Sequence, residues 1–229
     1  MPLSRYLTIL LLPLLCACAA LQKPRLDYTP GAVVETLSSA VALSVHATDH
    51  AMAGNGYLVY RRPDQVRLVV LSPFGTTLFE LFALGERIVL VYPSQATAYS
   101  GRFDELPDRG GAQGWRLLRW VLEIDPPAAE RTSATVERMG RQGFIEKVQF
   151  ENGLVTAKSA PGGEQVFYTD YALVSGVPLA GGIELRDGRD GRILLRFDEP
   201  EVNTPLDDGA FTPRLDGMTI LPLSAIQGL

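Results

Sequence analysis

Short segments in which apolar and polar residues alternate recur along most of this chain, and this pattern constrains the fold more than any other feature. Between positions 41 and 100 they follow one another roughly every ten to twelve residues, a spacing typical of strands in antiparallel sheets. The segments are Val41–Ala47, Gly56–Arg61, Gln65–Leu71, Thr77–Leu84, Arg87–Tyr92 and Thr97–Ser100, and a turn is expected at Gly54-Asn55. The pattern predicts a mainly β protein, an antiparallel meander bent into a sandwich or barrel.

More strand-like segments follow position 131, separated by residues typical of turns. They are Thr132–Met139, Phe144–Phe150, Leu154–Ser159, Gln165–Leu173, and a last hairpin of Ile183–Arg186 with Ile193–Phe197. Because the sequence has no internal repeat and no second domain boundary, we expect residues 31–229 to form one domain. Residues from about 199 to 229 have little pattern and are expected to be an extension that wraps the surface.

The segment Thr77–Leu84 is apolar on both faces. One face carries Phe79, Leu81 and Ala83, and the other carries Leu78, Phe82 and Leu84 beside Glu80. Antiparallel sheets usually have one solvated face, so something is expected to cover each side of this strand. A closed protein core and a ligand cavity explain the pattern about equally well.

Residues 113–124 break the period of two. Arg116, Arg119 and Glu123 form a narrow polar stripe at helical spacing, and the rest of the circumference is apolar. The segment contains both tryptophans of the protein, and Asp125-Pro126-Pro127 ends it. Two interpretations stay open: a core helix that plugs a barrel end, or a lid over a lipid-sized cavity.

The N-terminus indicates export. The apolar run Leu7–Leu15 behind Arg5 is too short to span a bilayer, which needs about 20 residues, but it suits a signal peptide. Leu15-Cys16-Ala17-Cys18 resembles a bacterial lipobox, which predicts a signal peptide at 1–17, acylation of Cys18 and a lipidated tether at 18–30. An ordinary secretory signal cleaved near Ala17-Cys18-Ala19 is the alternative.

Composition argues against nucleic-acid binding, metal chemistry and catalysis. The net charge is −5, and the chain has only two His and two Cys. His46 and His50 have a metal-like spacing only on a helix, whereas a strand is predicted there. Asp187 and Asp190 are too few for a calcium site, and Asp207-Asp208 is expected to be solvated. We therefore expect no enzyme activity, no cofactor, no metal and no nucleic-acid partner.

Three stretches, in chain order, resemble the LolB family of outer-membrane lipoprotein receptors within the LolA/LolB-like superfamily. Arg67–Leu81 contains Ser72-Pro73-Phe74-Gly75, which is similar to the family's Ser-Pro-Leu-Gly loop between two strands. Leu118-Arg119-Trp120-Val121-Leu122, with Pro126 after it, is similar to the family's LRQWILG-P helix. Gly182–Phe197 is similar to the family's final hairpin.

The resemblance implies a half-open antiparallel β-barrel with a helical lid and an apolar cavity. It implies a receptor on the periplasmic face of the outer membrane that takes acylated lipoproteins from a LolA-like carrier and inserts them into that membrane. Ala19, where Asp would signal inner-membrane retention, implies the same location. We expect the protein to be a monomer.

In this interpretation Pro73, Phe74 and Gly75 form the loop that contacts outer-membrane lipid, with Phe74 in place of the family's protruding Leu. The lid side chains are Trp115, Leu118, Trp120 and Leu122. Two alternatives share the fold: a periplasm-facing lipoprotein that binds a lipid or glycolipid, and a structural envelope-assembly lipoprotein with a packed barrel. Residues 202–229 have no recognised counterpart in the family and could fill or cover the cavity.

Overall fold

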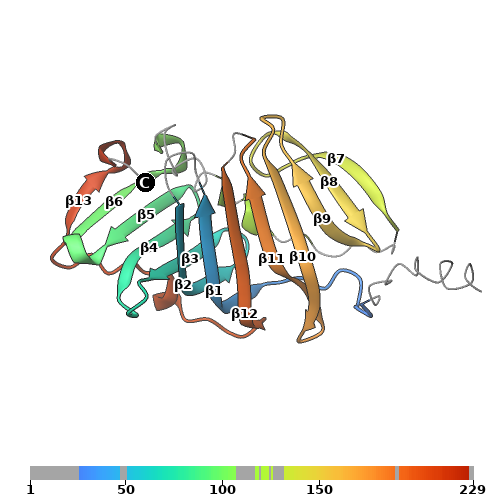
Figure 1. Ribbon diagram of the computed structural model, residues 1–229, viewed down its shortest axis with the longest axis horizontal. Helices are drawn as coiled ribbons and strands as arrows, with labels where there is room; N and C mark the ends of the chain where they lie inside the picture. Colours follow the sequence, from blue (N-terminus) through green and yellow to red (C-terminus); the bar gives the residue numbers. More distant parts are fainter. Residues whose placement is uncertain are drawn as a thin grey trace, which may run out of the picture.

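The computed structural model describes residues 26–46, 51–106, 117–118, 120–123, 125, 132–188 and 191–226. These residues form one 13-stranded sheet in the order β13-β6-β5-β4-β3-β2-β1-β12-β11-β10-β9-β8-β7 (Figure 1). The strands are β1 Thr36–His46, β2 Ala51–Arg61, β3 Gln65–Leu71, β4 Thr77–Leu84, β5 Arg87–Tyr92, β6 Thr97–Arg102, β7 Ala134–Met139, β8 Ile145–Glu151, β9 Leu154–Ser159, β10 Gln165–Val174, β11 Val177–Arg186, β12 Arg192–Val202 and β13 Thr219–Pro222. Short 3₁₀ turns are η2 Pro93–Gln95, η3 Phe103–Glu105, η4 Asp208–Phe211 and η5 Leu223–Ala225.

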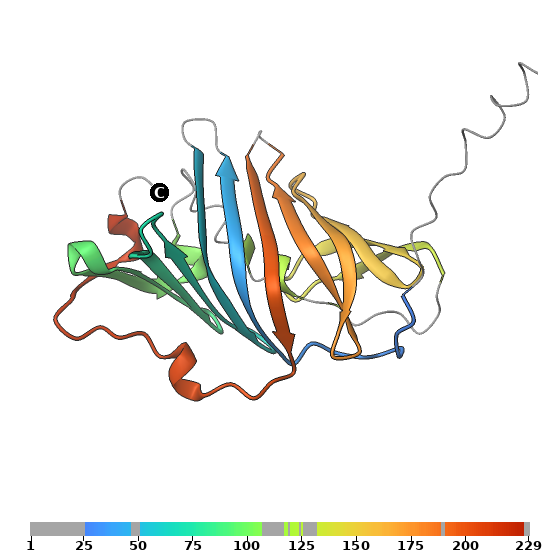
Figure 2. The ribbon, with the colours of Figure 1, turned by 60° about the horizontal axis from the view of Figure 1, so that its bottom comes forward.

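The sheet is open. Neighbouring strands pair antiparallel, with β13 on β6 as the one parallel pair among the described strands. The long strands β1 and β12 pair in the middle of the sheet, from Leu37 opposite Val202 to His46 opposite Arg192. Strands β7 and β13 are the two edges and do not meet, so the curved sheet makes a half-open barrel (Figure 2). The predicted β class and half-open architecture are confirmed.

Alternate residues of the central strands face a common apolar interior. In β1, for example, Leu37, Val41 and Leu43 are buried, while the residues between them are more exposed or small. The same alternation in β2 and β3 buries Leu58, Tyr60, Val66 and Leu68. Residues 117–118 and 120–122 are α-helical and pack against this inner face, as part of the same core cluster.

The outer face of β4 to β6 is covered by the C-terminal segment. Phe82, Val89, Val91 and Ala98 form a second buried cluster, against which Leu215 and Met218 pack. Protein therefore covers both faces of β4 from Phe79 to Ala83, as the two apolar faces led us to expect, whereas Leu78 near the start of the strand is 41% exposed. After β13 the chain turns inward, and Leu223 is fully buried in the main core. The predicted surface-wrapping extension thus begins after β12, which continues through Glu199 to Val202.

The helical segments of the described residues include none with the length and apolarity that spanning a bilayer requires.

Candidate functional site

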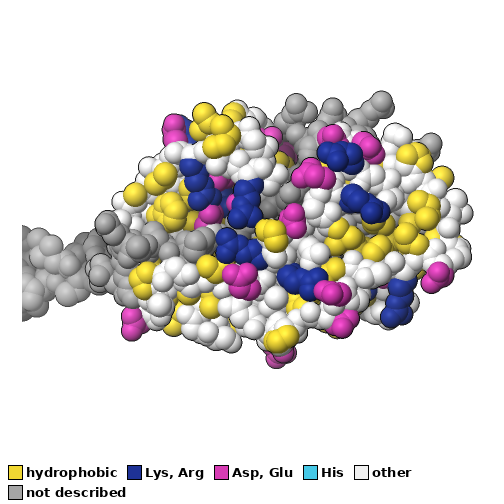
Figure 3. All heavy atoms as spheres, turned by 180° about the vertical axis from the view of Figure 1, so that it is seen from behind, with side chains coloured by type: hydrophobic (Ala, Val, Ile, Leu, Met, Phe, Trp, Pro, Cys, Tyr) yellow, Lys and Arg dark blue, Asp and Glu magenta, His cyan; other side chains and the backbone are white. Residues whose placement is uncertain are grey.

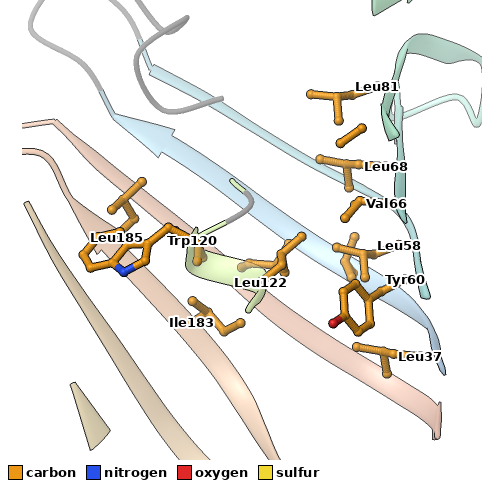
Figure 4. Close-up of a cluster of buried hydrophobic side chains, with 14 of the residues drawn as sticks. Leu37, Leu58, Tyr60, Val66, Leu68, Leu81, Trp120, Leu122, Ile183 and Leu185 are labelled. Carbon is orange, nitrogen blue, oxygen red and sulfur yellow. The ribbon is translucent and has the colours of Figure 1, made fainter. Parts of the chain in front are cut away.

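The helix over the inner face fills most of the space inside the sheet. Trp120 and Leu122 are 0% and 1% exposed, and Leu118 is half-buried. In Figure 4, Trp120 lies beside Leu185, and Leu122 lies between Ile183 and the Leu58 side of the core. The structure thus brings three of the four predicted lid residues into one apolar interior, whereas Trp115 lies outside the described residues.

A cavity of about 30 Å³ remains between this helix and the sheet. All of its lining is apolar: Leu43, Leu58, Leu68, Leu118, Val121, Leu122, Ile183, Leu185, Ile193 and Leu195. A second cavity of about 20 Å³ lies toward β9 to β11, beside Lys158 and Tyr168. Each space is of the size that holds about one water, whereas pockets for small-molecule ligands span roughly 300–1,000 Å³. Neither of these two cavities, as the described residues form them, has room for an acyl chain.

A buried ion network joins the C-terminal end of the helix to the β7–β9 part of the sheet. We define it as Asp125, Arg138, Glu146 and Lys158. Asp125 accepts a 2.6 Å hydrogen bond from Nη2 of Arg138 and pairs with Nζ of Lys158 at 2.7 Å. Nε of Arg138 donates to Oε1 of Glu146 at 2.7 Å. Because Glu146 and Lys158 are fully buried, their charges depend on these partners.

Two further hydrogen bonds attach the helix to this network. Nε1 of Trp120 donates to Oε2 of Glu146, and Nζ of Lys158 donates to the backbone carbonyl of Glu123 at 2.7 Å. In addition, the buried hydroxyl of Tyr168 donates to the carbonyl of Val121 at 3.0 Å. The C-terminal end of the helix is therefore fixed by polar contacts as well as by apolar packing.

The electrostatics of this end follow from burial. Burial raises the pKa of Glu123, against the nearby Lys158 charge that lowers it. Burial also raises the pKa of Tyr168 well above its ordinary value. Burial opposes the charge on Arg138, but its hydrogen bonds to Asp125 and Glu146 outweigh that effect and raise the pKa of Arg138.

Sequence analysis missed the ion network, although one signal was present. Glu146 occupies the same face of β8 as buried Val148, so a charge stands at a position where the alternation expects an apolar side chain. A charged residue in phase with a buried one indicates a partner inside the protein.

The predicted membrane loop presents Phe74 to solvent, with 93% of the residue exposed. Ser72 holds the turn: its hydroxyl accepts hydrogen bonds from the backbone N–H of Phe74 and of Thr76, both at 3.2 Å. The Ser72 N–H donates to the Thr76 carbonyl at 2.8 Å, and Gly75, at φ +79°, donates to the Ser72 carbonyl at 2.9 Å. The loop is thus internally hydrogen-bonded, with its aromatic ring pointing away from the core.

The face seen from behind carries both hydrophobic and charged side chains. Hydrophobic side chains are exposed on both halves of this face, and charged side chains of both signs lie across the middle (Figure 3). A polar cleft of about 260 Å³ lies beside the ion network, with Arg62, Glu123 and Arg141 among its lining.

The remaining candidates have structural partners or lie outside the described residues. Asp187 accepts a 2.9 Å hydrogen bond from the Gly191 N–H and closes its hairpin loop. Asp207 caps η4 through the Gly209 N–H, and Asp208 pairs with Arg61 at 2.7 Å. In the described part of the chain, no group of three or more His, Cys, Asp or Glu could hold a metal ion. Cys18, His50 and Asp190 lie outside the described residues.

An open antiparallel sheet curved around an apolar interior, with a helix over its inner face, defines a LolA-like fold. A LolA superfamily protein from Nitrosomonas europaea has this fold at a TM-score of 0.54 and 13% identity, over 78% of this chain and 90% of that one. A DUF1329 family protein from Desulfovibrio piger gives a TM-score of 0.58 at 10% identity over 78% and 90% of the two chains. A domain assigned to outer membrane lipoprotein sorting in Vibrio parahaemolyticus gives 0.55 at 8% identity over 77% and 88%.

The family model described as outer membrane lipoprotein LolB matches residues 37–199, and the chain belongs to the LolB family. No curated protein sequence matches this chain. The match begins in β1 and ends within β12, so it spans the helix and the loop that carries Phe74. Membership of the LolB family supports a general role in lipoprotein binding or sorting at the outer membrane.

Proposed function

We propose that this protein is a receptor, anchored by lipid on Cys18 to the periplasmic face of the outer membrane. It takes acylated lipoproteins from a LolA-like carrier and inserts them into that membrane, as a single domain from residue 31 onward. The observation that carries the proposal is the helix that contains Leu118, Val121 and Leu122. It covers a concave face whose remaining cavity has only apolar lining.

In this proposal the helix is a lid that moves outward when cargo binds. The acyl chains then take the place of Leu118 and Leu122 against the inner face of the sheet. Each methylene is worth about 0.8 kcal/mol in any apolar environment. Acyl chains therefore pass from carrier to receptor to bilayer along small differences in affinity, and no covalent bond forms or breaks.

Phe74 contacts the membrane that receives the cargo. Its ring is almost fully exposed on a hydrogen-bonded turn, so its burial in the acyl region costs little ordering. Burying a Phe side chain gains roughly 1.5–3 kcal/mol, which favours release of cargo at the bilayer.

Depletion of the protein in its native host tests the receptor role. Other lipoproteins are expected to accumulate in the periplasm, and a plasmid copy of the gene restores their localisation. Normal localisation of lipoproteins in the depleted cells would reject the receptor role.

A structural lipoprotein that acts through protein contacts is the second candidate. The small size of the two interior cavities, about 20 and 30 Å³, favours it, as do the ion pairs that hold the helix end. Uptake of a fluorescent long-chain fatty acid separates the two. A lid opens and retains the probe, whereas a permanently packed barrel retains none. Retained lipid with normal lipoprotein localisation would instead identify a lipid- or glycolipid-binding lipoprotein.

A further inference from the structure

The largest hollow described for this protein lies outside the apolar interior. It has a volume of about 590 Å³ and is next to the loop that carries Phe74. Its floor is the outer face of β12, β1 and β2, because the register places Ala42 between Arg196 and Asn55, and Ser44 between Leu194 and Ala53. Leu71, Ser72, Pro73 and Gly75 form the wall on the side of the loop. We call this hollow the outer groove.

The outer groove combines an apolar, small-residue floor with a single charge. Ala42, Ala53 and Gly54 have small side chains or none and so leave space above the sheet. Leu71 and Leu194 add apolar surface. Arg196 is the only charged residue of the lining. It is exposed and pairs with no acidic side chain of the described residues, including Asp198 two positions further along β12. The groove therefore offers a positive charge with no acidic group in its lining to compensate it.

We propose that the outer groove binds the phosphate and adjoining glycerol of a membrane phospholipid, an inference that rests on the membrane contact of the proposed function. A guanidinium matches a phosphate group through two parallel hydrogen bonds. The apolar floor fits the glycerol and the first methylenes, which a free phosphate ion would leave uncovered. Phe74 follows Pro73 on the groove wall, so its ring and Arg196 can meet the acyl boundary and the phosphate layer of one leaflet.

Photocrosslinking on the full chain tests this proposal. The protein is reconstituted in vesicles of phosphatidylethanolamine with a minor fraction of phosphatidylglycerol and a trace of phospholipid that carries a photoreactive group beside its phosphate. Mass spectrometry is expected to locate cross-links in residues 42–44 and 53–55. Arg196→Gln should reduce them about tenfold, the loss expected for one charged hydrogen-bonded contact, and Arg196→Lys should restore them in part.

Arg87→Gln is the matched control, because Arg87 is also exposed but begins β5, at the end of the β4–β5 hairpin remote from the loop. It should leave the cross-links unchanged. Ala53→Trp fills the groove without removing the charge, and it should reduce the cross-links as Arg196→Gln does. Unchanged melting temperatures of these variants exclude misfolding as the cause.

Three results would overturn the proposal. Cross-links to the Phe74 loop with none in the groove would reject the groove and leave the proposed membrane contact standing. Groove cross-links that Arg196→Gln and Ala53→Trp do not change would reject the role of the phosphate site. Binding of glycerol 3-phosphate, without vesicles, at least as tight as the binding of the phospholipid would identify a site for soluble phosphate esters instead.

Discussion

Nε1 of Trp120 donates a 2.5 Å hydrogen bond to Oε2 of Glu146, and both side chains are completely buried. The carboxylate belongs to β8 and the indole to the helix, so one buried contact links the element that covers the interior to the far part of the sheet. A buried carboxylate without hydrogen-bond partners is energetically costly. Displacement of the C-terminal end of the helix would remove the Trp120 partner of Glu146 and is therefore unfavourable.

Replacing Glu146 by Gln should therefore destabilise the fold. The substitution removes the negative charge that Arg138 and Trp120 share, and a hydrogen bond to a charged group is worth about 1.5–3 kcal/mol. We expect the free energy of unfolding to fall by about 2 kcal/mol or more, measured by urea denaturation. Glu137→Gln in β7 is the control. Glu137 pairs with Lys147, and both side chains are 61% exposed, so this substitution should leave the free energy of unfolding nearly unchanged. Equal stability of the two variants would contradict a stabilising role for the network.

The ion network could not be predicted from the sequence, whereas most of the strands could. The strands follow local alternation, and most were predicted within a few residues of their observed bounds. In contrast, Asp125, Arg138, Glu146 and Lys158 come from four different segments, and only the folded sheet brings them together. Their pairing depends on tertiary geometry that no local pattern encodes.

The prediction of a turn at Gly54-Asn55 was wrong for a related reason. Both residues lie inside β2, which begins at Ala51 and pairs with β1 and β3. Glycine is needed at Gly56 because a Cβ there would collide with the backbone carbonyl of Val69 on β3. Glycines inside a strand can mark close backbone approach as well as a turn. The local sequence does not separate the two.

The local sequence pattern also did not predict which residues cover the outer face of β4. The two apolar faces predicted a cover on each side, but the partners Leu215 and Met218 lie more than a hundred residues away in the chain. The candidate site was predicted in part: the helix and the exposed Phe74 follow local signals, while the small volume left inside depends on how the side chains pack.

The C-terminal segment should contribute to stability through Leu223. This side chain is 0% exposed and packs into the main core beside Gly101, where it closes the β6 end of the interior. Leu223→Ala should lower the free energy of unfolding by about 2–5 kcal/mol, the range for buried Leu-to-Ala changes. Ile220→Ala, in the same segment but 56% exposed, should change it by less than about 0.5 kcal/mol. Equal effects on thermal unfolding would show that the segment is not part of the core.

Stability should fall at high pH because of Tyr92. Burial, with a smaller contribution from Tyr99, raises the pKa of Tyr92 from 10.0 to about 12. The folded state thus holds this proton more tightly than the unfolded state does. The resulting stabilisation is complete below pH 10 and is lost as the pH rises toward 12. Urea unfolding of wild type and Tyr92→Phe at several pH values should show a smaller loss for the variant in this window, and parallel curves would contradict the assignment.

Phe74→Glu should separate membrane contact from folding. The side chain is almost fully exposed, so we expect the melting temperature to stay close to that of wild type. A carboxylate at the tip of the loop is unfavourable in the acyl region, so transfer of lipoproteins into vesicles should be blocked. Phe74→Leu, which restores the family's residue, should retain transfer. Full transfer by the Glu variant would reject the membrane role, and a large fall in melting temperature would show a core role instead.

Trp120 should report whether the helix moves when acyl chains enter. Trp115→Phe leaves Trp120 as the sole tryptophan, because the chain has two. In this structure the indole of Trp120 is buried and hydrogen-bonded to Glu146, so its fluorescence should change if the helix is displaced. Because the present interior holds only about 30 Å³ beside Leu118 and Leu122, a long-chain fatty acid can enter only if the helix shifts. Titration with such a ligand should therefore change the emission spectrum and saturate. A constant spectrum with no retained ligand would establish the packed barrel, in which the helix is a permanent part of the core.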